Sequence, residues 1–219
     1  MGRNRTSLMK STNVSARPEL TATLVRLMLS VNDIALAADA NDQWAETGER
    51  KRAAMRNAAR GYFVRVLLSH VYEGLLIAEE ISRSANLRSA VDECDKQTIS
   101  AFGFLEDVVK SREMKVFHAL RNRATFHYDR QLPLLSFEEI AEKQPERQWS
   151  CSAGSEPLDW RFELADAVVD RMMIREVFRL RGPRGPERTA KTEELALRLQ
   201  DISHRFTEFA FHYVRHFSR

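Results

Sequence analysis

The sequence predicts an all-α protein, built as an antiparallel bundle of about five to six helices. Apolar residues recur at intervals of three and four along most of the chain, and the alternation typical of strands is nowhere sustained. Only 8 Gly and 6 Pro occur among 219 residues, so residues that break helices are scarce. With 43% apolar residues the chain can bury a core of its own, and we expect a single domain over residues 17–219.

The first part of the chain predicts a basic arm and two long helices. Residues 1–16 are polar and basic and predict a flexible N-terminal arm. Pro18 suits the first turn of a helix that keeps one apolar face to about Ala40. A second helix is expected from about residue 50 to 84. The side chains that we expect it to turn toward the core are Ala59, Tyr62, Phe63, Val66, His70, Glu73, Ile77 and Ile81.

Two shorter helices are expected next. The first covers roughly residues 90–109. Ser111 has the side chain of an N-cap and predicts the start of the second. We expect Pro133 to close this helix, because proline interrupts the hydrogen bonds of a helix interior.

The last part of the chain predicts a loop, a hinge and two further helices. Residues 144–157 are rich in Pro, Ser, Gly and Gln and predict a loop insertion, and residues 182–186 predict a hinge. A helix is expected between them, from about residue 159 to 179. The most regular apolar stripe of the chain follows and consists of Leu195, Leu199, Ile202, Phe206, Phe209, Tyr213 and Phe217. Such a stripe packs against another helix, in the bundle or in a partner chain, and it leads us to expect a homodimer.

Charge and cysteine content limit the classes of function. The formal net charge is only +3, but basic residues cluster in the arm and over residues 49–65 and 179–191. Clusters of this kind suit RNA or another polyanion, although solvated helix faces also account for them. Cys94 and Cys151 form neither a disulfide framework nor a metal-ligand pattern. Because no apolar leader stands at the N-terminus, we expect a cytoplasmic protein with no membrane contact.

The strongest chemical signal is the stretch Arg121-Asn122-Arg123-Ala124-Thr125-Phe126-His127-Tyr128. An Arg side chain stays charged at any working pH, and a His side chain can take and give a proton near neutrality. Asn122 stands where its amide can orient either group. Arg123 and His127 are four residues apart and share a helix face, so Arg123 is a second candidate for a phosphate contact.

This pattern of an Arg, a polar neighbour and a His a few positions on resembles the HEPN superfamily of small α-helical proteins. Many of its members are metal-independent ribonucleases or toxins. The resemblance implies that Arg121, Asn122 and His127 are catalytic, and that Arg123 and Tyr128 contact the substrate. It implies no cofactor and no metal. RNA is the expected substrate, and an antitoxin or another protein partner would fit a toxin or defence setting.

Two polar residues on the expected inward stripe are candidate supporting partners of this motif. His70 and Glu73 are three residues apart, a spacing that also suits a metal-ligand pair. The remaining ligands of a di-iron site are missing from the sequence, so a buried hydrogen-bonded pair is the better interpretation.

The expected chemistry is cleavage of RNA through its own 2′-hydroxyl. His127 would remove the proton from that hydroxyl, and Arg121 would stabilise the charge that develops on the phosphate oxygens. The competing interpretation is a non-catalytic helical scaffold that binds a nucleotide or a protein, in which the motif is structural.

Overall fold

The computed structural model of the protein describes residues 17–46, 48, 50–122, 131–155, 161–174 and 186–217. These residues form eight α-helices and one antiparallel pair of two-residue strands, so the all-α helical bundle expected from the sequence is confirmed. The helices are α1 (Pro18–Glu46), α2 (Arg50–Arg83), α3 (Ala85–Asp92), α4 (Lys96–Lys110), α5 (Arg112–Leu120), α6 (Gln131–Lys143), α7 (Glu163–Met172) and α8 (Pro186–Phe217). The strands are β1 (Cys151–Ser152) and β2 (Arg161–Phe162).

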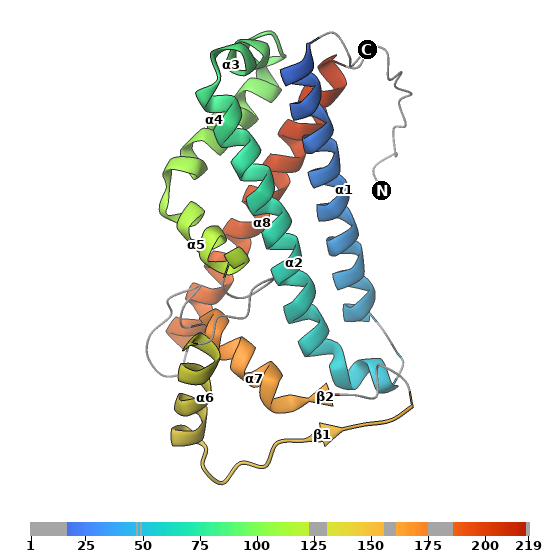
Figure 1. Cartoon of the computed structure of the whole chain (residues 1–219), viewed down its shortest axis with the longest axis vertical. Coiled ribbons are helices and arrows are strands. Elements are labelled where there is room, and N and C mark those ends of the chain that lie inside the picture. The colour runs from blue at the N-terminus through green and yellow to red at the C-terminus, as the bar shows by residue number, and fades with distance from the viewer. Residues whose placement is uncertain are drawn as a thin grey trace.

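Three long helices hold the core together. Residues 47–49 join α1 to α2, and a connection this short makes neighbouring helices antiparallel. In Figure 1, α1 and α2 run side by side and α8 packs against both. The shorter helices α4 and α5 cover the other side of α2, and α4 also contacts α8. The largest side chains of this core are Tyr213, Phe102, Phe117, Phe206 and Phe209, all of them fully buried.

The regular apolar stripe of α8 lies inside this core. Leu199, Ile202, Phe206, Phe209 and Tyr213 are at most 5% exposed. The two ends of the stripe, Leu195 and Phe217, are partly buried against the same cluster. The stripe therefore packs within its own chain, and the expected homodimer cannot rest on it.

A glycine lets α2 and α8 approach closely. A Cβ atom on Gly74 of α2 would lie only 2.3 Å from Cζ of Phe206 on α8. Real Cβ atoms are essentially never found this close to another heavy atom, so the aromatic ring occupies the space that any larger residue would need. Gly74 thus fixes the depth at which Phe206 enters the core.

Several expected elements differ from the structure. The helix expected over residues 90–109 is two helices, because Asp95 caps a new start: its carboxylate accepts a hydrogen bond of 2.8 Å from the backbone N–H of Thr98. Pro133 does not close the motif helix. It lies in the first turn of α6, where a proline without an N–H group is tolerated. The strand pair was not anticipated: β1 lies in the expected loop insertion, and β2 occupies the start of the helix expected over residues 159–179, which begins at Glu163 as α7.

The core-facing stripe expected for α2 is also wrong in its middle part. Tyr62 is 50% exposed and the Glu73 side chain 46% exposed, so neither belongs to the core. The buried face is set by Leu68, Val71 and Leu75 instead. Glu73 is therefore a surface residue, which matters for the site described below.

α1 is the one helix among the described residues that is long and apolar enough to cross a bilayer by length and composition. Its best 18-residue window has a mean hydropathy of 1.4, and 39% of that window is buried inside the fold. Leu20, Leu24, Leu27 and Ile34 account for much of this burial. The sequence-based expectation of no membrane contact did not take this helix into account.

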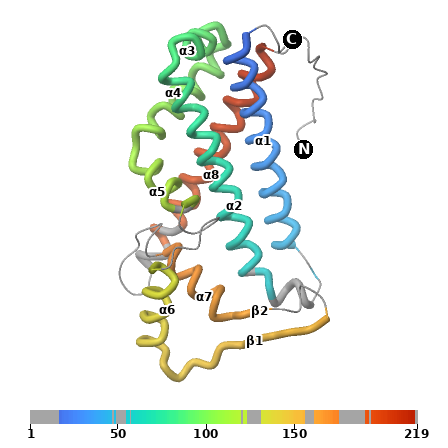
Figure 2. The backbone as a smooth tube through the Cα atoms, in the orientation of Figure 1, coloured from blue at the N-terminus to red at the C-terminus, as the bar shows by residue number. Residues whose placement is uncertain are grey.

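At the end of the bundle where α2 begins, α6 and α7 pack on each other (Figure 2). An ion pair between Glu139 of α6 and Arg171 of α7 ties them together, with Nε of Arg171 at 2.7 Å from Oε2 of Glu139. The strand pair leads into α7, whose first residue, Glu163, accepts hydrogen bonds from Ser150.

Candidate active site

The candidate site lies where α5 ends against α2. Ser111 caps the start of α5 by accepting a hydrogen bond of 3.2 Å from the backbone N–H of Glu113. Phe117 is completely buried, and α5 packs on α2. The next residue, His118, is exposed. The buried Phe117 thus fixes a helix whose final turn stands at the protein surface.

Arg121 follows α5 in helical geometry, with φ of −59° and ψ of −46°. Its side chain crosses to α2, where Nε donates a hydrogen bond of 2.9 Å to Oε1 of Glu73. Nη1 donates a second bond of 2.9 Å to Oδ1 of Asn122. The Arg121 side chain remains 36% exposed. Among the described residues no contact engages Nη2, so part of the guanidinium faces solvent.

Asn122 links Arg121 to a histidine. Its Nδ2 lies 2.9 Å from Nε2 of His118, one helical turn earlier. Because Oδ1 of Asn122 already accepts from Arg121, its Nδ2 must be the donor to His118. Nε2 of His118 is then an acceptor, and a neutral imidazole in this position carries its proton on Nδ1. Glu73, Arg121, Asn122 and His118 therefore form one bonded chain, which we call the Arg121 network.

Tyr72 closes the inner side of the Arg121 network. Its ring meets that of His118 edge-on, with the ring centroids 5.8 Å apart. Burial raises the pKa of the Tyr72 hydroxyl above its ordinary value, and the nearby Glu73 carboxylate raises it further. Tyr72 thus keeps its proton at neutral pH and supports the imidazole as an aromatic wall.

The arrangement fixes the guanidinium of Arg121 at the protein surface, near the imidazole of His118. The guanidinium of Arg121 is oriented from two sides and keeps donors for an incoming anion such as a phosphate. Its charge is partly balanced by Glu73, so an anion must compete with that carboxylate. These groups can bind a phosphodiester, but Nε2 of His118 already accepts from the Asn122 amide and is not free to take a proton from a substrate.

The structure brings together three of the residues singled out from the sequence, namely Arg121, Asn122 and Glu73. It does not bring His70 to them. Nδ1 of His70 lies 3.4 Å from Oδ2 of Asp33 on α1, on another side of α2. The remaining candidates, Arg123, His127 and Tyr128, lie outside the described residues.

Sequence reasoning missed His118. The signal was present, because His118 stands four residues before Asn122, the spacing at which two helical side chains meet. The resemblance to HEPN proteins places the histidine after Arg121, whereas His118 precedes it in the sequence.

No metal centre is found in the described part of the chain, because no three His, Cys, Asp or Glu side chains there lie close enough to share an ion. The Arg121 network itself offers one carboxylate and one imidazole on the two sides of a cation, which is no arrangement for holding a metal.

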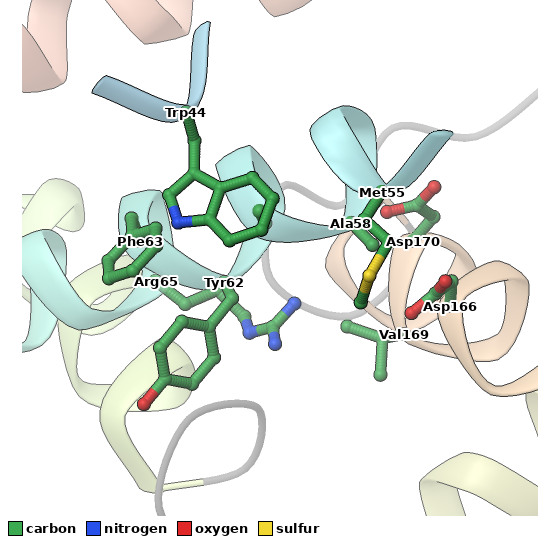
Figure 3. Close-up of a pocket in the computed structure, with 10 residues that line it drawn as sticks. Trp44, Met55, Ala58, Tyr62, Phe63, Arg65, Asp166, Val169 and Asp170 are labelled. Carbon is green, nitrogen blue, oxygen red and sulfur yellow. The ribbon is translucent and has the colours of Figure 1, made fainter. Parts of the chain in front are cut away.

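A separate pocket of about 340 Å³ opens between α2 and α7 (Figure 3). Trp44 and Tyr62 provide aromatic walls, and Arg65 lies with its guanidinium 5.9 Å from the Tyr62 ring centroid. Asp166 and Asp170 of α7 line the opposite side. None of the lining residues belongs to the Arg121 network. The pocket lining combines one cation and two carboxylates with aromatic and apolar walls, so it does not select one class of ligand.

Comparison of the chain with protein-family models, with curated proteins and with solved structures gives no match.

Proposed function

We propose that this protein is a metal-independent endoribonuclease of HEPN type, with Arg121 at its active site. The observation that carries the proposal is the Arg121 network, in which Glu73, Asn122 and Arg121 are joined by hydrogen bonds of 2.9 Å and His118 extends the chain. An Arg held in a fixed direction at the surface, beside an amide and an imidazole, suits recognition of a phosphodiester.

In the proposed reaction Arg121 contacts the non-bridging oxygens of the scissile phosphate. A base removes the proton from the 2′-hydroxyl, and the 2′-oxygen attacks phosphorus. The bond from phosphorus to the 5′-oxygen breaks, and this oxygen leaves with a proton from solvent. The products are a 2′,3′-cyclic phosphate and a 5′-hydroxyl. We assign the base to His127, as the motif implies, and His118 positions Arg121 through Asn122.

Basic residues on the same long helix support RNA as the polyanion. Arg60 is exposed on the N-terminal half of α2, thirteen residues before Glu73. At a rise of about 1.5 Å per residue the two are roughly 20 Å apart along the helix. Thirteen residues at 100° each also leave Arg60 about 140° around the helix axis from Glu73, so a strand that contacts both must cross from one face of α2 to another.

The test is cleavage of a mixed-sequence RNA by purified protein in EDTA. We expect cleavage by the wild type. Arg121→Ala and His127→Ala should lose about 10²–10⁴-fold in rate, because each removes a group that acts in the transition state. His118→Ala should lose less, since it only loosens Asn122. Arg112→Ala and His204→Ala are the matched controls, because both residues are exposed and lie outside the Arg121 network.

Cleavage that requires a divalent ion would reject the proposal, as would equal rates in Arg121→Ala and Arg112→Ala. Circular dichroism must show that each variant keeps its helical content. If the loss fell on His118→Ala and spared His127→Ala, the base would be His118, whose Nε2 would have to release the Asn122 amide to take the proton.

A non-catalytic binding protein is the second candidate. The observation that favours it is the ion pair between Arg121 and Glu73, which satisfies the cation within the chain and can serve to fix α5 on α2. In that case the wild type would bind RNA or a nucleotide without cleaving it, and Arg121→Ala would lower the Tm more than Arg112→Ala does.

A further inference from the structure

An exposed stripe runs along the outer side of α1. Its members follow one another at intervals of four and three residues: Pro18, Ala22, Val25, Leu29, Asn32 and Leu36. All six are exposed, with Val25 at 44%, Leu29 at 58% and Leu36 at 69%. By the 100° turn per residue of an α-helix they stay within about 80° around the axis. We call this set the α1 stripe.

The α1 stripe is distinct from the face that α1 turns to the core. Leu20, Leu24, Leu27 and Ile34 are buried against the rest of the bundle. In Figure 1, α1 forms the right-hand side of the molecule along most of its length, and only the end of α8 extends past its upper end. A helix with a second stripe at intervals of four and three, apolar except at Asn32, has the pattern of a helix that pairs with another helix.

We propose that a second copy of this chain covers the α1 stripe, with the two α1 helices antiparallel. The argument is that the stripe complements itself in this orientation. When Leu29 is set opposite Asn32 of the other copy, Val25 comes opposite Leu36. The two-fold axis repeats each contact, as an isologous interface requires.

Charge supports the antiparallel orientation. Arg26 and Asp33 flank the α1 stripe on the same side, and both are exposed. In this antiparallel register Arg26 of each copy lies two residues, or about 3 Å along the axis, from the level of Asp33 of the other, so the long Arg26 side chain reaches it and gives two ion pairs across the interface. A parallel pair would instead set Asp39 against its own copy at the end of the stripe.

Contacts within the chain hold these two charges at the surface. Nη1 of Arg26 lies 2.6 Å from Oε2 of Glu80, and Asp33 pairs with His70. Arg26 has further donors and Asp33 a second oxygen, so the pairs between copies can form beside the existing ones. The His70 side chain thus contacts α1 and lies away from the Arg121 network.

The expected interface is small. A helix of 29 residues is about 44 Å long, and pairing of one helix per copy falls at the low end of specific interfaces. We therefore expect a reversible dimer that dissociates in the micromolar range. This proposal does not depend on the ribonuclease function.

The experiment uses the full chain and measures mass by sedimentation equilibrium from one to one hundred micromolar. The wild type should reach the mass of two chains. Arg26→Asp sets two acids opposite each other, and Asp33→Arg sets two cations opposite each other, so each variant alone should be monomeric. A mixture of the two variants should form a heterodimer, because each Arg then meets an Asp. Only the antiparallel arrangement predicts this recovery.

Two controls separate the interface from the fold. Glu80→Gln removes the partner of Arg26 within the chain and should leave the dimer intact, and Leu29→Glu should abolish it while circular dichroism stays unchanged. A monomeric wild type, a dimer indifferent to Leu29→Glu, or a mixture that stays monomeric would each overturn the proposal. A monomer that binds anionic vesicles through Leu29 would also overturn it, and would assign the stripe to a lipid surface.

Discussion

At the scale of single residues, the Arg121 network explains how a charged side chain is held ready at a surface. The contact between Arg121 and Asn122 joins neighbours in the chain, and sequence reasoning anticipated that Asn122 orients a reacting group. The contact to Glu73 spans 48 residues and depends on how α5 packs on α2. Sequence patterning placed Glu73 in the core, because periodicity on a long helix leaves the exact rotation of its buried face undetermined.

The ion pair between Glu73 and Arg121 predicts the effect of neutralising the carboxylate. Glu73→Gln keeps the size of the side chain and removes the charge that competes with a phosphate. RNA should bind about 2–5-fold more tightly, since an exposed ion pair contributes about 1 kcal/mol or less. Fluorescence anisotropy with labelled RNA measures this Kd for the wild type and for Glu73→Gln, both of which keep Arg121.

The same charge change at Glu80 provides the control for that measurement. Glu80 lies on the same helix and pairs with Arg26, so Glu80→Gln should change the Kd little. An equal gain in both variants would mean that only the net charge matters, and that Glu73 does not compete for Arg121.

At the scale of elements, the long helices were predictable and the short ones were not. α1, α2 and α8 carry sustained apolar stripes, which require no knowledge of the rest of the fold. The break between α3 and α4 depends on a single cap at Asp95, and the strand pair has only two residues on each side. Whether so short a break or strand forms depends on a few hydrogen bonds, which must outweigh the helix propensity of the surrounding residues. A sequence pattern does not reveal these hydrogen bonds.

The cap at Asp95 predicts a pH-dependent contribution to stability. The backbone N–H of Thr98 is the main cause that holds the pKa of Asp95 below its ordinary value, and the Thr98 hydroxyl adds to it. A lowered folded-state pKa means that the carboxylate stabilises the fold above its unfolded pKa and loses this effect as the pH falls through the folded one. Asp95→Ala should lower the Tm at pH 7, and the difference should close below about pH 4.

Thermal scans of wild type, Asp95→Ala and Asp95→Asn from pH 3 to 7 check this expectation. Asn also caps helices, so Asp95→Asn should keep most of the Tm. A difference between wild type and Asp95→Ala that stays constant over this pH range would show that the carboxylate charge has no part in the cap.

The close approach of α2 and α8 predicts opposite effects for two glycine substitutions. Gly74→Ala pushes a methyl group into the Phe206 ring and should destabilise the fold by about 1–3 kcal/mol. Gly103→Ala in α4 meets nothing within 4 Å and should stabilise it by up to about 1 kcal/mol, because alanine favours the helix. Urea unfolding followed by circular dichroism measures both. Equal effects at the two positions would contradict the packing described for Gly74.

At the scale of the whole molecule, two helices carry stripes of similar period that differ in burial. The stripe of α8 is buried in its own bundle, and the α1 stripe is exposed. The spacing of apolar residues predicts that a helix face is covered by a neighbour. Whether this neighbour belongs to the same chain depends on how all the helices are arranged in the fold. For the same reason the buried stripe of α8 gives no support to the dimer that the sequence predicts from it, and the dimer stays a prediction.

The most direct test of the ribonuclease account is the chemistry of the cut ends. An RNA oligonucleotide and a DNA oligonucleotide of the same base sequence are incubated with the protein in EDTA. The masses of the products are then measured by mass spectrometry. The account predicts RNA fragments with 2′,3′-cyclic phosphate and 5′-hydroxyl ends and an intact DNA, because DNA lacks the attacking 2′-hydroxyl. Cut DNA, or RNA fragments with 5′-phosphate ends, would contradict it.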